Sequence, residues 1–61
     1  MLTEEQEDNG YRVESKGDYV LIWHNNHQIG LLMATPDVAQ RVQTLIQKHR
    51  REYEMATALK D

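Results

Sequence analysis

Histidine is the residue type whose spacing in this chain most resembles a chemical site. His24 and His27 flank the pair Asn25-Asn26, and a two-residue hairpin would hold their Cβ atoms about 5 Å apart on one face. Zinc sites use three or four protein ligands, but the chain has no cysteine and no carboxylate nearby in sequence to complete the set. His49 could do so only by approaching in the fold or from a second subunit. We therefore predict no metal site and no cofactor, with the histidine pair at a solvated turn and His49 half-buried.

Nucleophiles and acid–base pairs are no better placed. Ser15 lies at a turn with no histidine close to it in sequence, and Thr35 is better suited to cap a helix. The three glycines are scattered and form no phosphate-binding pattern. A chain of 61 residues buries only about 60% of the surface that its unfolded form exposes, which leaves little for a deep substrate cleft. We predict that the protein is not an enzyme.

A second kind of site would combine aromatic stacking with cations. Tyr19 and Trp23, if they lie on an open sheet face, resemble the platforms that hold single-stranded nucleic acid. Phosphate binding needs several converging cations, but the aromatic platform offers one arginine. The basic cluster at 48–51 is followed by glutamates, a pattern that is typical of a solvated helix face. Nucleic-acid binding is thus the alternative prediction, and its candidate contacts are Arg12, Lys48, Arg50 and Arg51.

Strands are expected first along the chain. Residues 11 to 33 are rich in β-branched and aromatic types, broken at Lys16-Gly17 and Asn25-Asn26. Glycine and asparagine tolerate the positive φ that tight hairpin turns require. The pattern predicts three antiparallel strands, roughly at 11–15, 18–24 and 27–33.

A long helix is expected to follow. Thr35-Pro36-Asp37 combines a cap, a proline at the first helical position and an acid that favours the helix dipole. A helix from Pro36 to Lys60 would measure about 37 Å, against about 20 Å for a six-residue strand. Its last turns must overhang the sheet, fray or find a partner. Its apolar stripe comprises Val38, Val42, Leu45, Ile46, His49, Tyr53 and Ala56.

Two-residue turns also predict which side chains share a sheet face. The expected pairs are Val13 with Val20, Tyr11 with Ile22, Ile22 with Ile29, and Val20 with Leu31. With Met33 and the helix stripe they would form the core, which we expect to bury Val20, Ile22, Ile29, Leu31, Val42, Leu45 and Ile46. The opposite face would carry Arg12, Glu14, Tyr19, Leu21, Trp23, Gln28, Gly30 and Leu32.

This second face is too apolar to remain in water, because contiguous exposed apolar patches usually mark interfaces. We predict self-association through the sheet face, through the helix overhang or through both. The alternative is that the overhang or the N-terminal residues fold back over the face. The predicted interaction surface is Tyr19, Leu21, Trp23, Leu32, Tyr53 and Leu59.

Charge is distributed unevenly. Residues 1–9 carry four acids and no base, whereas residues 10–61 carry six acids and seven bases. We predict an acidic, disordered tail over 1–9 and one domain over 10–61. The first residues do not resemble a secretory signal, and no apolar run reaches the roughly 18 residues of a membrane span. The expected location is the cytoplasm, away from membranes.

These observations predict an α+β fold, with a three-stranded antiparallel meander followed by one long C-terminal helix, in a dimer. The expected function is a small non-catalytic protein–protein interaction module. It would be a homodimeric accessory, inhibitory or regulatory protein that occupies a surface of a larger, basic host protein, and its acidic tail would steer it toward that partner. Its size and format are typical of accessory proteins of phages and mobile elements. A nucleic-acid-binding or transcription-regulatory protein is the alternative.

Overall fold

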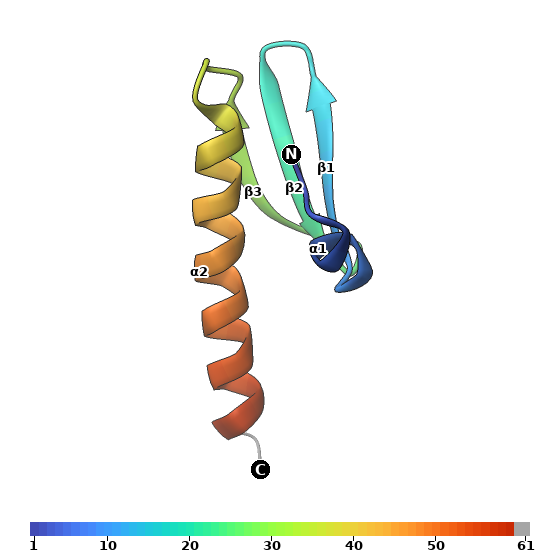
Figure 1. The fold of residues 1–61 in the computed structure, drawn as a ribbon, viewed down its shortest axis with the longest axis vertical. Helices are drawn as coiled ribbons and strands as arrows, with labels where there is room; N and C mark the ends of the chain where they lie inside the picture. Colours follow the sequence, from blue (N-terminus) through green and yellow to red (C-terminus); the bar gives the residue numbers. More distant parts are fainter. Residues whose placement is uncertain (60–61) are drawn as a thin grey trace.

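The computed structural model describes residues 1–59, apart from the side chain of Leu59, and confirms the predicted α+β fold (Figure 1). Three antiparallel strands in the order β1-β2-β3 precede a long C-terminal helix. The molecule is elongated, with extents of 41 × 18 × 17 Å. The elements are α1 (Glu4–Asp8), β1 (Tyr11–Lys16), β2 (Tyr19–His24), β3 (His27–Met33) and α2 (Val38–Leu59).

Both hairpins turn on residues with positive φ. Asn25 and Asn26 have φ of 49° and 69°, and Gly17 has φ of 60°. The first turn occupies Gly17 and Asp18, one residue later than predicted, so Val13 pairs with Ile22 and not with Val20. Moving the turn by one residue shifts the pairing by two, which leaves the side chains of β1 and β2 on their expected faces.

The second hairpin contains a bulge that overturns part of the predicted core. His24 pairs with His27 as expected, but Ile22 pairs with Gly30 because Ile29 is an extra residue at an irregularity beside Ile22 and Trp23. An extra residue exchanges the two faces for everything that follows it in the strand. Leu31 and Met33, predicted to be buried, are therefore 57% and 65% exposed. Leu32, predicted to be open, packs against the core.

The core lies between the sheet and α2. Leu45 of α2 approaches the bare backbone of Gly30 so closely that a Cβ there would collide with its Cδ1 atom. Ile29 and Leu45, both predicted to be buried, are half-buried against the core. The buried apolar residues are Tyr11, Val20, Ile22, Val42 and Ile46.

The N-terminal residues cover the rest of the core face, and residues 4–8, expected in a disordered tail, form the short helix α1. Thr3 caps α1, accepting a hydrogen bond from the Gln6 amide at 3.1 Å while the Gln6 side chain accepts one from Thr3 N at 2.9 Å. This reciprocal pair offsets part of the ordering cost that disfavours structure in a short polar segment. The amides of Gln6 and Gln43 also pair, at 2.7 and 2.9 Å.

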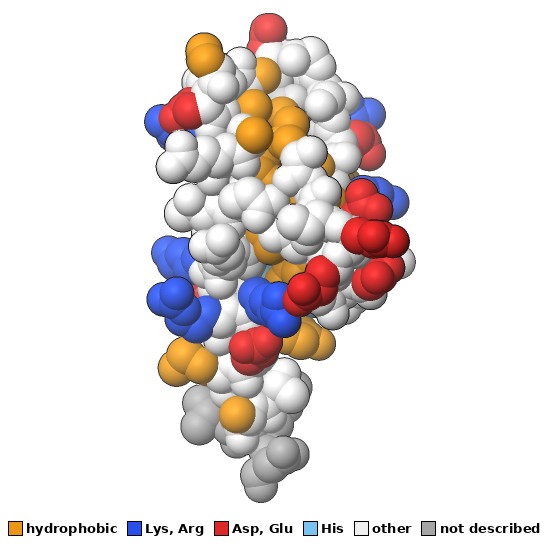
Figure 2. Space-filling model, viewed as in Figure 1, with side chains coloured by type: hydrophobic (Ala, Val, Ile, Leu, Met, Phe, Trp, Pro, Cys, Tyr) orange, Lys and Arg blue, Asp and Glu red, His pale blue; other side chains and the backbone are white. Residues whose placement is uncertain are grey.

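The segment does not fold back over the open sheet face, which was one of the two alternatives. Leu2 packs against the core cluster, and the segment passes in front of β1 and β2 on the side of the sheet that α2 covers (Figure 1). Figure 2 shows the acidic side chains of this region beside the cations of α2, where Arg50 binds Glu5 at 3.2 Å.

The helix α2 begins at Val38, after a turn in which Val38 N donates to Thr35 O at 3.0 Å. The Thr35 hydroxyl and the Arg41 guanidinium both donate to Asp37, which lowers the pKa of that carboxyl. The helix then runs past the end of the sheet, which is one of the three outcomes expected for its last turns (Figure 1). Within residues 1–59, no helix combines the length and apolarity needed to cross a membrane.

Candidate interaction surfaces

The open face of the sheet is the side that neither α2 nor the N-terminal segment covers. Tyr19, Leu31 and Met33 are 42%, 57% and 65% exposed there. Leu21 and Trp23 continue this face along β2 toward the second turn and are half-buried. Tyr19 pairs with Met33, and Leu21 with Leu31, across β2 and β3. The result is an apolar patch of five side chains, which we call the open face.

Charged residues of β1 border the open face. The Arg12 guanidinium lies over the Trp23 ring, 5.3 Å from its centroid. Glu14 and Lys16 form an ion pair at 2.9 Å, which lowers the pKa of the Glu14 carboxyl and raises that of the Lys16 amine. Both signs of charge thus lie along one side of the apolar patch.

The structure groups only part of the predicted interaction surface. Tyr19, Leu21 and Trp23 lie on the open face, whereas Leu32 lies on the core side because of the bulge. Its place is taken by Leu31 and Met33. The sequence holds one signal for this exchange, because an isolated glycine within an apolar strand, here Gly30, is typical of a bulge or a close backbone approach.

The remaining predicted contacts belong to the helix overhang. Tyr53 is 51% exposed and Met55 is 60% exposed, so the overhang does carry apolar side chains. Tyr53 also contacts the end of the core, with its ring 5.1 Å from that of His24. The side chain of Leu59 lies outside the described residues.

Two histidines meet at the end of the core. His24 is only 8% exposed, and its ring lies 4.4 Å from Tyr11 and 4.9 Å from His49. The Tyr11 hydroxyl and His49 Nδ1 are hydrogen-bonded at 2.9 Å. His27 pairs with His24 across the turn, but its side chain is exposed to solvent and takes no part in this contact. We call Tyr11, His24, His49 and Tyr53 the aromatic cluster.

Burial in the aromatic cluster favours the neutral forms of His49 and Tyr11. Burial is the main reason that the pKa of His49 is lowered, and the neighbouring His24 lowers it further, while Glu52 acts in the opposite direction. Burial likewise raises the pKa of the Tyr11 hydroxyl, against the effect of Arg50. In the described part of the chain, no three His, Asp or Glu side chains converge as metal ligands would.

The candidate nucleic-acid contacts do not converge on one surface. Arg12 lies beside Trp23 on the open face, but Lys48, Arg50 and Arg51 belong to α2, which covers the other side of the sheet. Arg50 is bound to Glu5 and Glu54, each at 3.2 Å, which raises its pKa and neutralises its charge. Beside the aromatic residues of the open face lie Arg12, at Trp23, and Lys16, across from Tyr19, and Lys16 is paired with Glu14.

Comparison with known proteins adds no relative from which a function could be transferred. No protein-family model, no curated protein and no solved structure matches this chain.

Proposed function

We propose that this protein is a small, non-catalytic protein–protein interaction module that forms a homodimer through the open face of its sheet. The observation that carries the proposal is the patch containing Tyr19, Leu31 and Met33, each more than two-fifths exposed on the uncovered side of β2 and β3. A monomer would leave these side chains in water, at a cost of about 25 cal/mol for each Å² of apolar surface that a partner could bury.

A second copy of the chain suits this patch. A two-fold interface brings the same surface together from both sides, so it must be self-complementary. The open face has an apolar centre. Along its border on β1 it carries two positive side chains, Arg12 and Lys16, and one negative side chain, Glu14. Opposed copies could therefore bury the centre and pair opposite charges at its border.

The size of the patch limits the strength of the dimer. Three strands of about 20 Å, spaced about 4.8 Å apart, present a face of a few hundred Å². Stable interfaces bury about 800 Å² on each partner. We therefore expect a dimer that dissociates in the micromolar range.

The proposed role is that of an accessory, inhibitory or regulatory protein that occupies a surface of a larger protein in the cytoplasm. Small proteins of phages and mobile elements have this format. Four acids, Glu4, Glu5, Glu7 and Asp8, lie in or beside one turn of α1, and such a local charge favours encounter with a basic partner. The net charge of −3 acts in the same direction.

Sedimentation equilibrium from about 5 to 500 µM tests the dimer, since a weak interface dissociates within that range. We expect Leu31→Lys with Met33→Lys to abolish the dimer, because both side chains are exposed and their replacement spares the core. Met55→Lys, on the helix overhang, is the matched control and should leave the dimer intact. A single species of 7.2 kDa throughout would contradict the proposal. A dimer broken only by Met55→Lys would place the interface on the overhang.

A further inference from the structure

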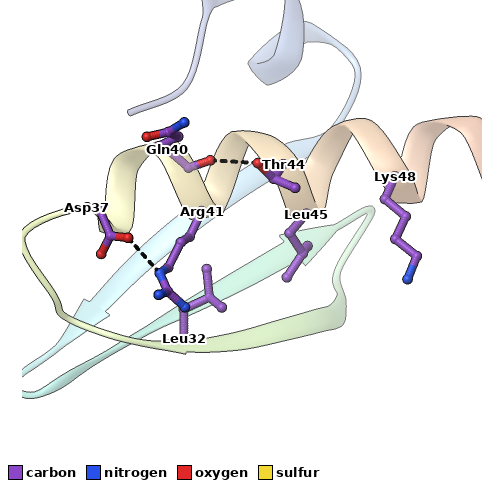
Figure 3. A pocket seen from close by; sticks show the side chains of 7 residues that line it. All are labelled: Leu32, Asp37, Gln40, Arg41, Thr44, Leu45 and Lys48. Carbon is purple, nitrogen blue, oxygen red and sulfur yellow. Dashed lines mark hydrogen bonds and ion pairs between the residues drawn. The ribbon is translucent and has the colours of Figure 1, made fainter.

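A second surface, separate from the open face, lies between α2 and the edge of the sheet. A groove of about 570 Å³ runs along this side of the molecule. Leu32 of β3 and Leu45 of α2 give it apolar walls, and Arg41 and Lys48 project from the helix on either side of Leu45 (Figure 3). The groove therefore combines an apolar centre with two cations and one carboxylate, that of Asp37, which is paired with Arg41.

The strand beside the groove has a free edge. Among residues 1–59, β3 pairs with β2 alone. Ala34 N donates to Asp18 O at 2.9 Å, so the alternation of an antiparallel ladder directs the main-chain groups of Leu32 toward β2. The same alternation directs the N–H groups of Leu31 and Met33 away from β2, toward the free edge. The carbonyl group of Leu31 points the same way. A strand added at this edge would find two donors and an acceptor in place.

The two edges of the sheet differ in how well they are protected. Charged side chains on an edge strand discourage the addition of another strand. Along β1 these are Arg12, Glu14 and Lys16. The segment Ile29–Met33 of β3 has neither a charge nor a proline. The edge of β3 is thus the one open to strand addition.

We propose that the edge of β3 and the adjoining groove bind an extended, acidic peptide segment of a partner protein. The segment adds as a fourth strand to β3, places an apolar side chain between Leu32 and Leu45, and places carboxylates near Arg41 and Lys48. This is β-augmentation, in which main-chain hydrogen bonds supply affinity and the pocket supplies selectivity.

The charges at the groove favour an acidic peptide over a second copy of the chain. Arg41 is partly neutralised by Asp37 at 2.9 Å, whereas Lys48 forms no ion pair within the part of the chain that the structure describes. A two-fold pairing at this edge would bring the cation-bearing sides of two α2 helices together, and like charges brought together disfavour an interface. An acidic segment meets the same cations with opposite charge.

Fluorescence anisotropy with labelled peptides of about seven residues tests the selectivity, in the low micromolar protein range where the dimer is dissociated. The probes alternate Glu with Val, or Lys with Val. We expect the acidic peptide to bind and the basic one not to bind. Lys48→Glu should weaken binding about fivefold or more, the size expected when one exposed ion pair becomes a repulsion. Arg51→Glu, an exposed charge reversal on the same helix, is the control and should have less effect.

Amide hydrogen exchange tests the mode of binding. The acidic peptide should slow exchange at Leu31 and Met33, whose N–H groups face the free edge, and change Leu32 little because it already bonds to β2. N-methylation of alternate peptide amides should abolish this protection. Tyr19→Lys, on the open face, should leave binding unchanged.

Three results would overturn the proposal: no binding of the acidic peptide, equal binding of the basic one, or binding without protection at Leu31 and Met33. A loss of binding in Tyr19→Lys would move the peptide to the open face. None of these results depends on the dimer, so this proposal and the proposed function can fail separately.

Discussion

At the scale of single residues, Ile29 decides which leucine of β3 belongs to the core. It is the extra residue of the bulge, and beyond it Gly30 and Leu32 face α2 while Leu31 and Met33 face solvent. The close approach of Leu45 to Gly30 explains this choice, because a side chain at that position would hold the helix away from the sheet.

Leucine truncation tests the assignment of the two faces. Leu32→Ala should lower the free energy of unfolding by about 2 kcal/mol, because it removes a half-buried side chain that packs on the core. Leu31→Ala, the matched control, should change it by less than about 0.5 kcal/mol at protein concentrations that favour the monomer. Urea denaturation measures both. The opposite order would mean that β3 pairs without the bulge.

His49 makes the stability depend on pH. Its pKa lies below its ordinary value of 6.5 in the folded chain, so the unfolded chain binds the proton more readily. Neutral His49 contributes its full stability at a pH above its unfolded-state pKa of 6.5. That contribution is lost as the pH falls through the lower pKa of the folded state. We expect the free energy of unfolding to fall between about pH 7 and pH 5.

Two histidine variants test the origin of this pH dependence. His49→Gln keeps a hydrogen-bonding side chain beside Tyr11 but cannot take up a proton, so the slope of stability against pH should decrease. His27→Gln changes an exposed histidine and should keep the slope of the parent protein. An unchanged slope in His49→Gln would contradict the assignment.

At the scale of elements, the N-terminal segment is part of the folded unit. Its polar contacts are the capping box of Thr3 and Gln6 and the amide pair of Gln6 and Gln43. Its apolar contact is Leu2, which packs against the core cluster. The helix α2 lies nearest to β3, so the N-terminal segment supplies the cover over the other side of the core face (Figure 1).

A substitution at Leu2 tests this contribution. Leu2→Ser should lower the free energy of unfolding by about 1 kcal/mol, because it exposes apolar surface that the segment now covers. Glu4→Ser changes an exposed side chain two residues later and is the control. Urea denaturation measures the free energy of unfolding, and amide hydrogen exchange at residues 6–9 measures how well the segment is protected. Equal stability of the two variants would mean that the segment contributes nothing to the core.

At the scale of the whole molecule, one helix and one short segment cover one face of the sheet, and the second face stays uncovered within the chain. The long axis of 41 Å exceeds the sheet because α2 continues beyond it. The open face, the helix overhang and the groove are separate surfaces made by different parts of the fold. Binding at one therefore need not exclude binding at another.

Trp23 reports on the dimer directly, because it is the single tryptophan and lies on the open face. Dimerisation through this face should remove water from the ring, so its emission should shift to shorter wavelength as the concentration rises from about 5 to 500 µM. The variant Leu31→Lys with Met33→Lys should show no shift. A shift in the parent protein that survives in this variant would assign the change to another interface.

The local sequence determined the three strands and the C-terminal helix of this protein. Turn residues separated the three strands, and alternation in β1 and β2 assigned their faces even though the first turn lies one residue later than predicted. The stripe of α2 was predicted through Val42, Ile46 and His49, all of which face the sheet. These features depend on neighbours within a few residues, so a single sequence is sufficient to show them.

Only the tertiary structure decided which residues of β3 are buried and which histidines meet. The bulge at Ile29 lets Leu45 reach Gly30, a contact between residues fifteen positions apart in sequence that no local pattern encodes. The same holds for His24, which packs on His49 of α2 although His27 is its neighbour across the turn. Period-two alternation defines a strand's faces only until one residue is inserted, and whether that happens depends on the helix packed above it.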